Sequence, residues 1–188
     1  MIVNGRKLLA AAPLSPMLAT KERAHGTSYG LAEAGIDIRV KQEIRFVPPK
    51  PFLLRELFLD DPDMVEAEKI KEAFHGYVDV DGYRTYGRCA LASSIERFDV
   101  PNHLVAIIGH KSTNARRFAC AWAGTTAEPG WSGHLTIELT FHGLEPVTIP
   151  AGSGIAQVLF HELAEPADYG NGKYQGQADR PVPAIMEG

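Results

Sequence analysis

Three observations predict that this chain folds as a mainly β protein. The stretch 135–140 alternates apolar and polar residues, which is the period of a strand with one buried face. Glycine, proline, asparagine or aspartate separates this stretch from others like it, as turns between strands require. Stretches of strand character occur at 77–80, 88–93, 104–108, 118–123, 134–141, 147–149 and 155–162. Many short strands at regular spacing indicate a sandwich or a closed barrel.

The part of the chain before residue 77 mixes helix and strand signals. Within residues 1–20, we expect a short helix from Gly5 to Ala12, because Pro13 and Pro16 prevent it from continuing. A strand is expected after this segment, where Ile36, Ile38 and Val40 would face one side of a sheet. The residues between them, Asp37 and Arg39, would face the other side.

Residues 47–75 contain a proline-rich break and the clearest helix of the sequence. After the break at 47–51, the stretch 52–60 fits a strand or a helix equally well. A helix is predicted at 61–75, with Asp61 as its cap and Pro62 in its first turn. It would be an insertion between strands, and its charged residues would form a solvated face.

Length and composition indicate one globular domain spanning residues 1–188. The chain is 45% hydrophobic and 22% charged, and its formal net charge is −4. Because there is no general basic field, nucleic acid is not an expected partner. Signal-peptide and membrane-span patterns are missing, so we expect a cytoplasmic protein with no membrane partner. The two cysteines, Cys89 and Cys120, are expected to be reduced thiols in the core.

The stretch 109–118 gathers hydroxyl and basic side chains after an apolar strand. If Ser112 caps a helical turn, Ser112 and Arg116 lie four residues apart on one face of it. A hydroxyl and a guanidinium on one face, close to Lys111, suit an anion or a polarised base. A serine cap followed by a solvated arginine explains the same pattern.

Glu138 lies on the polar side of the alternating strand. Leu135, Ile137 and Leu139 would point into the core, and Glu138 would point the opposite way. A glutamate in such a place is ordinarily only solvated, so the pattern alone does not make it catalytic.

A glycine-rich stretch at 169–177 offers donors that suit phosphate oxygens. Tyr169, Lys173 and Gln177 supply a phenol, an ammonium and an amide. With glycines and prolines on both sides, residues 166–188 are expected to form a loop or a mobile flap. The alternative is an exposed polar tail without a role in binding.

Four fragments in register resemble a known family. They are GHKSTNARR, EPGWSGHLTIEL, IPAGSGIAQVLF and GKYQGQ. Their order and spacing are similar to those of the dCTP deaminases, which belong to the dCTP deaminase/dUTPase superfamily, and AGIDIRV and ERFDVP also look like that family. The resemblance implies a dUTPase-like fold, a distorted jelly-roll-like β-barrel with a few short helices. It also implies a homotrimer with active sites between the subunits.

The resemblance further implies roles for individual residues. Glu138 corresponds to the family's catalytic general base, and Ser112 and Arg116 to the serine and arginine that flank the cytosine and help to place the attacking water. The implied substrate contacts are Lys111, Thr125, Glu128, Gln157, Tyr169, Lys173 and Gln177. No protein side chain is expected to bind a metal, since Mg²⁺ would be held through the nucleotide triphosphate. Many relatives have aspartate where Glu128 stands, and an aliphatic or aromatic residue where Asn114 stands.

The implied reaction is the hydrolytic deamination of dCTP to dUTP and ammonia, which feeds dUMP and dTTP synthesis. Zinc deaminases carry an HxE…PCxxC pattern, which this sequence lacks. A zinc-free route needs a carboxylate that moves a proton from water to the base, and Glu138 could do so if burial raises its pKa toward neutrality. The alternatives are a bifunctional enzyme giving dUMP and pyrophosphate, a dUTPase, and a non-catalytic nucleotide-binding trimer. We also expect that dTTP could act as an inhibitor.

Overall fold

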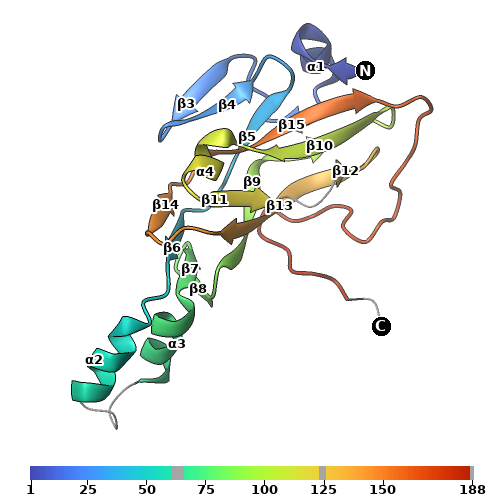
Figure 1. Ribbon diagram of the computed structural model, residues 1–188. Helices are drawn as coiled ribbons and strands as arrows, with labels where there is room; N and C mark the ends of the chain where they lie inside the picture. The colour runs from blue at the N-terminus through green and yellow to red at the C-terminus, as the bar shows by residue number, and fades with distance from the viewer. Residues whose placement is uncertain (61–65, 123–125, 187–188) are drawn as a thin grey trace.

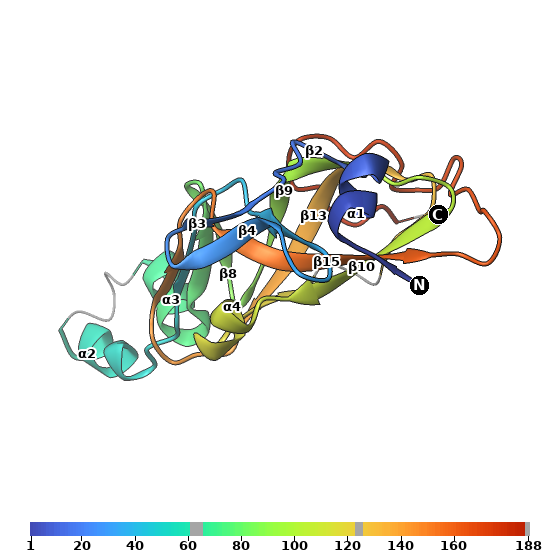
Figure 2. The same cartoon turned by 90° about the horizontal axis from the view of Figure 1, so that it is seen from above.

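The computed structural model describes residues 1–60, 66–122 and 126–186. Their strands form three antiparallel sheets around one hydrophobic core (Figure 1, Figure 2). The predicted mainly β fold is therefore confirmed. Each of the seven strand stretches predicted from residue 77 onward is present, with bounds that differ by a few residues.

The largest sheet has the strand order β12–β10–β15–β5–β4–β3, and β1 pairs with β15. Its members are β1 (Ile2–Val3), β3 (Lys21–Ala24), β4 (Thr27–Leu31), β5 (Ile36–Arg39), β10 (Leu104–His110), β12 (Thr126–Ala127) and β15 (Gly154–Glu162). The register of β15 places Gln157 opposite Asp37 on one side and opposite Gly109 on the other. This row of residues leads to the polar cluster described below.

The other two sheets have four strands each. The second sheet has the order β11–β13–β9–β2, with β2 (Leu14–Ser15), β9 (Cys89–Asp99), β11 (Ala119–Trp122) and β13 (Ser132–Phe141). The third has the order β14–β6–β7–β8, with β6 (Ile44–Val47), β7 (Tyr77–Val80), β8 (Tyr83–Tyr86) and β14 (Val147–Ile149). Because β9 and β11 flank β13, the strand of Glu138 is held on both edges.

The core joins all three sheets through large apolar side chains. Ile38 of β5 and Ile137 of β13 are both 0% exposed and belong to one cluster. Phe46 of β6 stacks on Phe141 of β13 with 4.9 Å between ring centroids, which ties the third sheet to the second. Burying each of these side chains stabilises the fold by about 1.5–3 kcal/mol.

The strand predicted at 36–40 is present but is buried on both faces. Ile36 and Ile38 point into the core as expected. Asp37, expected to face the other side, is also only 3% exposed, and it forms an ion pair with Lys111. Val40 follows the strand and makes an isolated bridge to Ser94.

The helices agree with the predictions in position but differ in extent. Helix α1 (Gly5–Ala11) ends at Ala12, which has a left-handed conformation. The stretch 52–60 is a helix, α2 (Phe52–Asp60). The helix predicted at 61–75 is shorter, since α3 (Ala67–His75) begins after an extended residue. Its predicted cap and first-turn proline, Asp61 and Pro62, lie outside the described residues.

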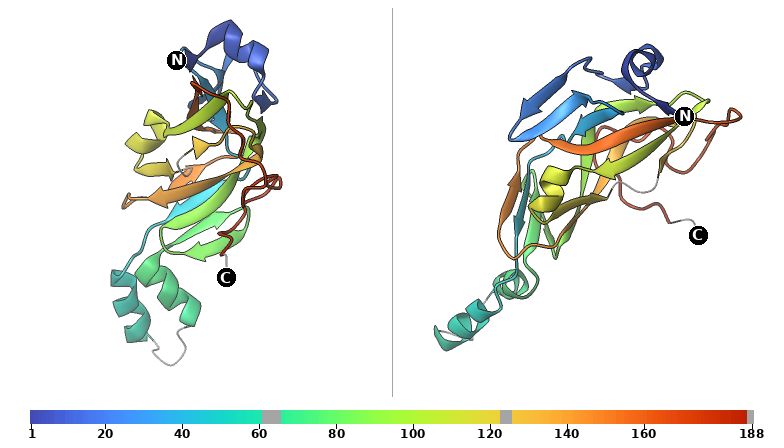
Figure 3. Two further views of the ribbon diagram at one scale, coloured as in Figure 1. Left: turned by 90° about the vertical axis from the view of Figure 1, so that its right-hand side faces the viewer. Right: turned by 45° about the horizontal axis from the view of Figure 1, so that its top comes forward.

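Helices α2 and α3 form a hairpin that projects from the end of the third sheet, far from α1 (Figure 1, Figure 3).

The predicted location of the cysteines is wrong for Cys89, which is exposed at the start of β9. The side chain of Cys120 is not described. None of the helices in the described segments is long and apolar enough to cross a membrane.

Candidate active site

A pocket of about 450 Å³ lies between β13 and the C-terminal segment that follows β15. Its size falls within the usual range of small-molecule sites. The pocket contains four of the residues predicted to act on a substrate, namely Glu128, Glu138, Tyr169 and Gln177. The rest of its lining is Leu91, Thr126, Ala127, Trp131, Leu135, Thr136, Tyr174, Val182 and Ala184. The strand carboxylate and the glycine-rich stretch therefore meet in one place.

The direction of Glu138 is fixed by its strand. It is paired with Leu91 of β9 and with Trp122 of β11. Its chain neighbours Ile137 and Leu139 are 0% and 1% exposed, whereas Glu138 itself is exposed. The predicted alternation is confirmed, and a single chain leaves this carboxylate in water.

The last part of the chain forms a wall beside Glu138. Val182 and Ala184 line the first pocket, whereas Pro181 and Pro183 line a second, mostly apolar pocket of about 940 Å³. Glu138 borders both pockets. The extended tail therefore separates two cavities that share one carboxylate.

Hydrogen bonds attach the tail to β13 and to the turn before it. Trp131 Nε1 donates to the carbonyl oxygen of Tyr174 at 2.7 Å. The backbone N–H of His134 donates to the carbonyl oxygen of Gln177 at 3.0 Å. The side-chain Oε1 of Gln177 accepts from the backbone N–H of Thr136 at 3.2 Å. Gln177 thus holds the tail against the strand while it lines the pocket.

Tyr169 and Lys173 occupy different surroundings. The backbone N–H of Tyr169 donates to the carbonyl oxygen of Pro129 at 2.7 Å, and its hydroxyl accepts from the backbone N–H of Tyr174 at 3.2 Å. Lys173 is exposed, with its Nζ 5.5 Å from the centroid of the Tyr174 ring. It is not in the pocket lining, although it stands on the same loop.

Replacing Trp131 by phenylalanine should loosen this loop without unfolding the protein. The ring would still pack on Phe98, whose centroid is 5.5 Å away, but the bond to Tyr174 would be lost. We expect the free energy of unfolding to fall by about 1 kcal/mol. Hydrogen exchange should become faster in residues 169–177 and stay unchanged in β9. Unchanged exchange in residues 169–177 would contradict the role of this bond.

A second attachment depends on pH. Asp179 forms an ion pair with Lys41 and lies 3.3 Å from His134 Nδ1. The hydrogen bond from Lys41 holds the pKa of Asp179 below its usual range, and the charges of His134 and Lys41 act in the same direction. Because the folded-state pKa is the lower one, this pair stabilises the fold above the unfolded-state pKa. Its contribution is lost as the pH falls through the folded-state pKa.

Asp179→Asn should therefore lower the melting temperature at neutral pH and have a vanishing effect in acid. Asp179 is half exposed, so the loss should stay below about 1 kcal/mol. Thermal unfolding of both proteins from pH 7 to pH 2 measures it. A difference that grows as the pH falls would contradict the assignment.

Ser112 and Arg116 lie on α4 (Ser112–Arg116), between β10 and β11. Arg116 Nε donates to Ser112 Oγ at 3.1 Å, so the predicted hydroxyl–guanidinium pair is present. The expectation that Ser112 caps the helix is wrong, because Lys111 occupies the cap position and no side-chain cap bond forms. Both residues of the pair are exposed, and neither lines the pocket of Glu138.

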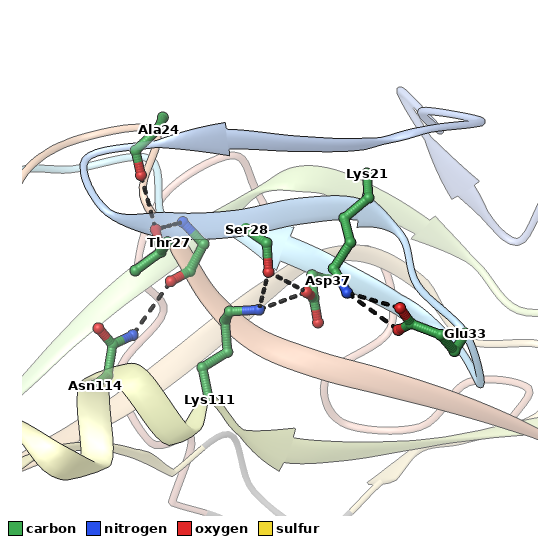
Figure 4. A network of polar contacts seen from close by, with 9 residues as sticks. Lys21, Ala24, Thr27, Ser28, Glu33, Asp37, Lys111 and Asn114 are labelled. Carbon is green, nitrogen blue, oxygen red and sulfur yellow. Dashed lines mark hydrogen bonds and ion pairs between the residues drawn. The ribbon is translucent and has the colours of Figure 1, made fainter.

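Lys111 and Gln157 are placed at a polar cluster rather than in the pocket. Lys111 Nζ forms an ion pair with Asp37 and donates to Ser28 Oγ at 3.0 Å (Figure 4). Gln157 is a half-buried residue of β15, directly across from Asp37. The charge of Lys111 is therefore already paired inside the chain.

Glu128 stands at the rim of the pocket of Glu138. It is exposed, and its Oε1 accepts from Thr126 Oγ1 at 2.7 Å. Thr125, which was predicted to contact the substrate, lies outside the described residues. The family resemblance placed Trp131 in a loop that shapes the pocket, and Trp131 does line it, whereas the part that Val182 plays was not predicted.

Metal-ligating side chains do not cluster in the described segments. There, no group of three or more His, Cys, Asp or Glu residues is placed to hold a metal ion. The described lining of the pocket has two carboxylates, those of Glu128 and Glu138, and neither histidine nor cysteine.

Two solved structures have some likeness to this chain. An EIAV dUTPase is 15% identical, with a TM-score of 0.43, over 74% of this chain and 87% of its own. The 2'-deoxycytidine 5'-triphosphate deaminase from Agrobacterium tumefaciens is 16% identical, with a TM-score of 0.49, over 86% of this chain and 48% of its own.

The sequence itself has closer relatives. A dCTP deaminase of Campylobacter lari is 37% identical over 164 residues, which cover 85% of this chain and 83% of that protein. A dCTP deaminase of Chloroflexus aurantiacus is 33% identical over 184 residues, or 96% of this chain and 94% of that protein. Residues 18–163 match the sequence pattern described as dCTP deaminase-like. The chain therefore belongs to the dCTP deaminase-like family.

Proposed function

We propose that this protein hydrolyses dCTP to dUTP and ammonia, with Glu138 as the general base. The observation that carries the proposal is the pocket in which Glu138 meets Tyr169 and Gln177, in a member of the dCTP deaminase-like family. A strand that is paired on both edges fixes the position of this carboxylate at the pocket. A general base needs such a fixed position, because it must lie within hydrogen-bond reach of the proton that it takes.

In the proposed reaction, Glu138 takes a proton from water, and the resulting hydroxide adds to C4 of cytosine. The proton passes from Glu138 to N3 of the ring, which gives a tetrahedral intermediate. Glu138 then moves the proton of the new C4 hydroxyl to the 4-amino group, so that the C4–N bond breaks, ammonia departs and the C4 carbonyl of dUTP forms. Water and dCTP thus give dUTP and ammonia, with no other reactant consumed.

One chain supplies only part of this site. Within the described lining of the pocket there are two carboxylates, Glu128 and Glu138, and neither lysine nor arginine. A nucleoside triphosphate is strongly anionic and needs cations around it. The exposed pair of Ser112 and Arg116, which lies outside this pocket, offers a guanidinium and a hydroxyl.

We therefore propose that a second copy of the chain presents Ser112 and Arg116 to the pocket, in a homotrimer with three shared sites. Arg116 would stabilise the charge that develops on the ring, and Ser112 would orient the water. The second copy would also remove Glu138 from water, which the single chain does not do. The substrate would enter as its Mg²⁺ complex, with the ion bound to triphosphate oxygens, and Lys173 would approach the phosphates from the tail. We further propose that the protein acts in the cytoplasm.

The test is to incubate the protein with dCTP and, separately, with dUTP in the presence of Mg²⁺. Release of ammonia and dUTP from dCTP is the expected result, and a zinc-selective chelator should not change it. Formation of dUMP and pyrophosphate from dCTP would indicate the bifunctional reaction, and cleavage of dUTP alone would indicate a dUTPase. Binding of dCTP without any turnover would refute catalysis and favour a nucleotide-binding protein.

A further inference from the structure

The short helix that carries Ser112 and Arg116 cannot hold its own position. Helix α4 has only five residues, and a single helical turn is not stable in isolation. Ser112 and Arg116 are both exposed, so they do not fix the helix by their own packing. Two other side chains, Lys111 at the start of the helix and Asn114 within it, reach into the body of the protein (Figure 4).

The first attachment is a buried ion pair. The side chain of Lys111 is 9% exposed and that of Asp37 is 3% exposed. Asp37 Oδ2 accepts from Lys111 Nζ and, at 3.0 Å, from Ser28 Oγ. Ser28 Oγ in turn accepts from Lys111 Nζ at 3.0 Å. Since leaving one buried charge without its partner is strongly unfavourable, Asp37 holds Lys111, and with it the first residue of the turn.

The second attachment is made by Asn114, which is 2% exposed. Its Nδ2 donates to the carbonyl oxygen of Gly154 at 3.2 Å, and the N–H of Gly154 donates to Thr27 Oγ1 at 2.7 Å. The backbone is so close here that a Cβ on Gly154 would lie 1.9 Å from the carbonyl oxygen of Ser28. Both attachments therefore end on the same rigid part of the largest sheet.

We infer that Asp37 is a positioning residue for the Ser112–Arg116 pair and acts through Lys111, whose ammonium serves this ion pair instead of the triphosphate. The inference rests on the proposed function, in which that pair completes the site of a neighbouring copy. It reassigns Lys111, which the family resemblance marked as a substrate contact. The buried carboxylate of Asp37 repels an anionic substrate, so it has no use as a phosphate ligand.

The test uses three variants, namely Asp37→Asn, Lys111→Met and the double variant that combines these two substitutions. The single variant Glu96→Gln is the control. Glu96 forms a largely buried ion pair with Arg39 at 2.7 Å, and its carboxylate oxygens accept hydrogen bonds from Arg39 rather than from a residue of α4, so Glu96→Gln controls for lost stability. We expect each of the first two variants to lower kcat for dCTP by about 10–100-fold, because a small misplacement of Arg116 is costly. KM should stay within about twofold of wild type. The kcat of the double variant should be no lower than that of the less active single variant.

Two outcomes would overturn the inference. If Lys111→Met raises KM at unchanged kcat, and Asp37→Asn does not lower kcat, then Lys111 is a phosphate ligand. If Asp37→Asn changes stability as Glu96→Gln does and leaves kcat intact, then the ion pair is only structural.

A second readout separates this inference from the proposed function. The Nε–H resonance of Arg116, assigned by its loss in Arg116→Lys, reports on the bond to Ser112 without any turnover. It should shift in Asp37→Asn and not in Glu96→Gln. If wild-type protein does not deaminate dCTP, the proposed function fails, and this shift still supports the positioning role. An unchanged resonance in Asp37→Asn would overturn it.

Discussion

Glu138→Gln is expected to lower kcat for dCTP by about 10³-fold while the protein still binds dCTP. Glutamine keeps the size and the hydrogen-bonding oxygen of glutamate, but it cannot accept a proton from water at neutral pH. General acid–base catalysis contributes about 10²–10⁴-fold, and in our proposal Glu138 performs more than one proton transfer. Because residues 137 and 139 are buried, the strand should keep its register in the variant.

Ammonia release measures the turnover of this variant, and titration calorimetry measures its binding of dCTP. The matched control is Glu33→Gln, which removes an exposed carboxylate that pairs with Lys21 outside the pocket. The control should turn over dCTP at the wild-type rate. Near-normal turnover by Glu138→Gln would refute the role of Glu138 as base, and loss of dCTP binding would reduce that role to substrate binding.

Arg116→Ala is expected to lower kcat by at least about 10²-fold, as removal of a donor that stabilises transition-state charge does in other enzymes. Arg116→Lys should restore little of this activity, because a lysine lacks the planar fork that donates to Ser112 Oγ and, in our proposal, to the substrate at the same time. The matched control is Arg117→Ala. Arg117 is the next arginine along the chain, and its Nη2 donates to the carbonyl oxygen of Thr148 at 3.0 Å.

Arg117→Ala removes the same charge from the same helix end and should keep kcat within about twofold of wild type. Steady-state kinetics at several dCTP concentrations measure both variants. Equal losses in Arg116→Ala and Arg117→Ala would show that the helix supplies only general positive charge. Retained activity in Arg116→Ala would remove Arg116 from the site.

Much of the β framework could be predicted from the sequence because strand periodicity and turn residues are local signals. The alternation around Ile137 placed the direction of Glu138 correctly. One local signal was overlooked. Asp81 and Gly82 both have positive φ, at 47° and 84°, and they form the turn that connects β7 to the unpredicted strand β8. An Asp–Gly pair favours such a hairpin turn.

The polar cluster under α4 could not be predicted, because it depends on distant pairing. Lys111 and Asp37 are 74 positions apart, and only the strand order β10–β15–β5 brings them together. The pattern of alternation placed Asp37 only on the side of the strand opposite to Ile36 and Ile38, and the family resemblance assigned Lys111 to the substrate. Neither the alternation nor the family resemblance shows that these two side chains are buried together. For the same reason, the separation of Ser112 and Arg116 from the pocket of Glu138 became visible only in the fold.

Mixing two inactive variants tests the shared site most directly. Glu138→Gln and Arg116→Ala, each nearly inactive alone, would be co-expressed in equal amounts with different tags, and the mixed oligomers purified through both tags. If each site takes Glu138 from one copy and Arg116 from another, every purified mixed trimer has one site with both residues intact, or about a third of its sites. We therefore predict that the mixture deaminates dCTP at a substantial fraction of the wild-type rate. Mixed oligomers that are as inactive as their parents would contradict a site shared between copies.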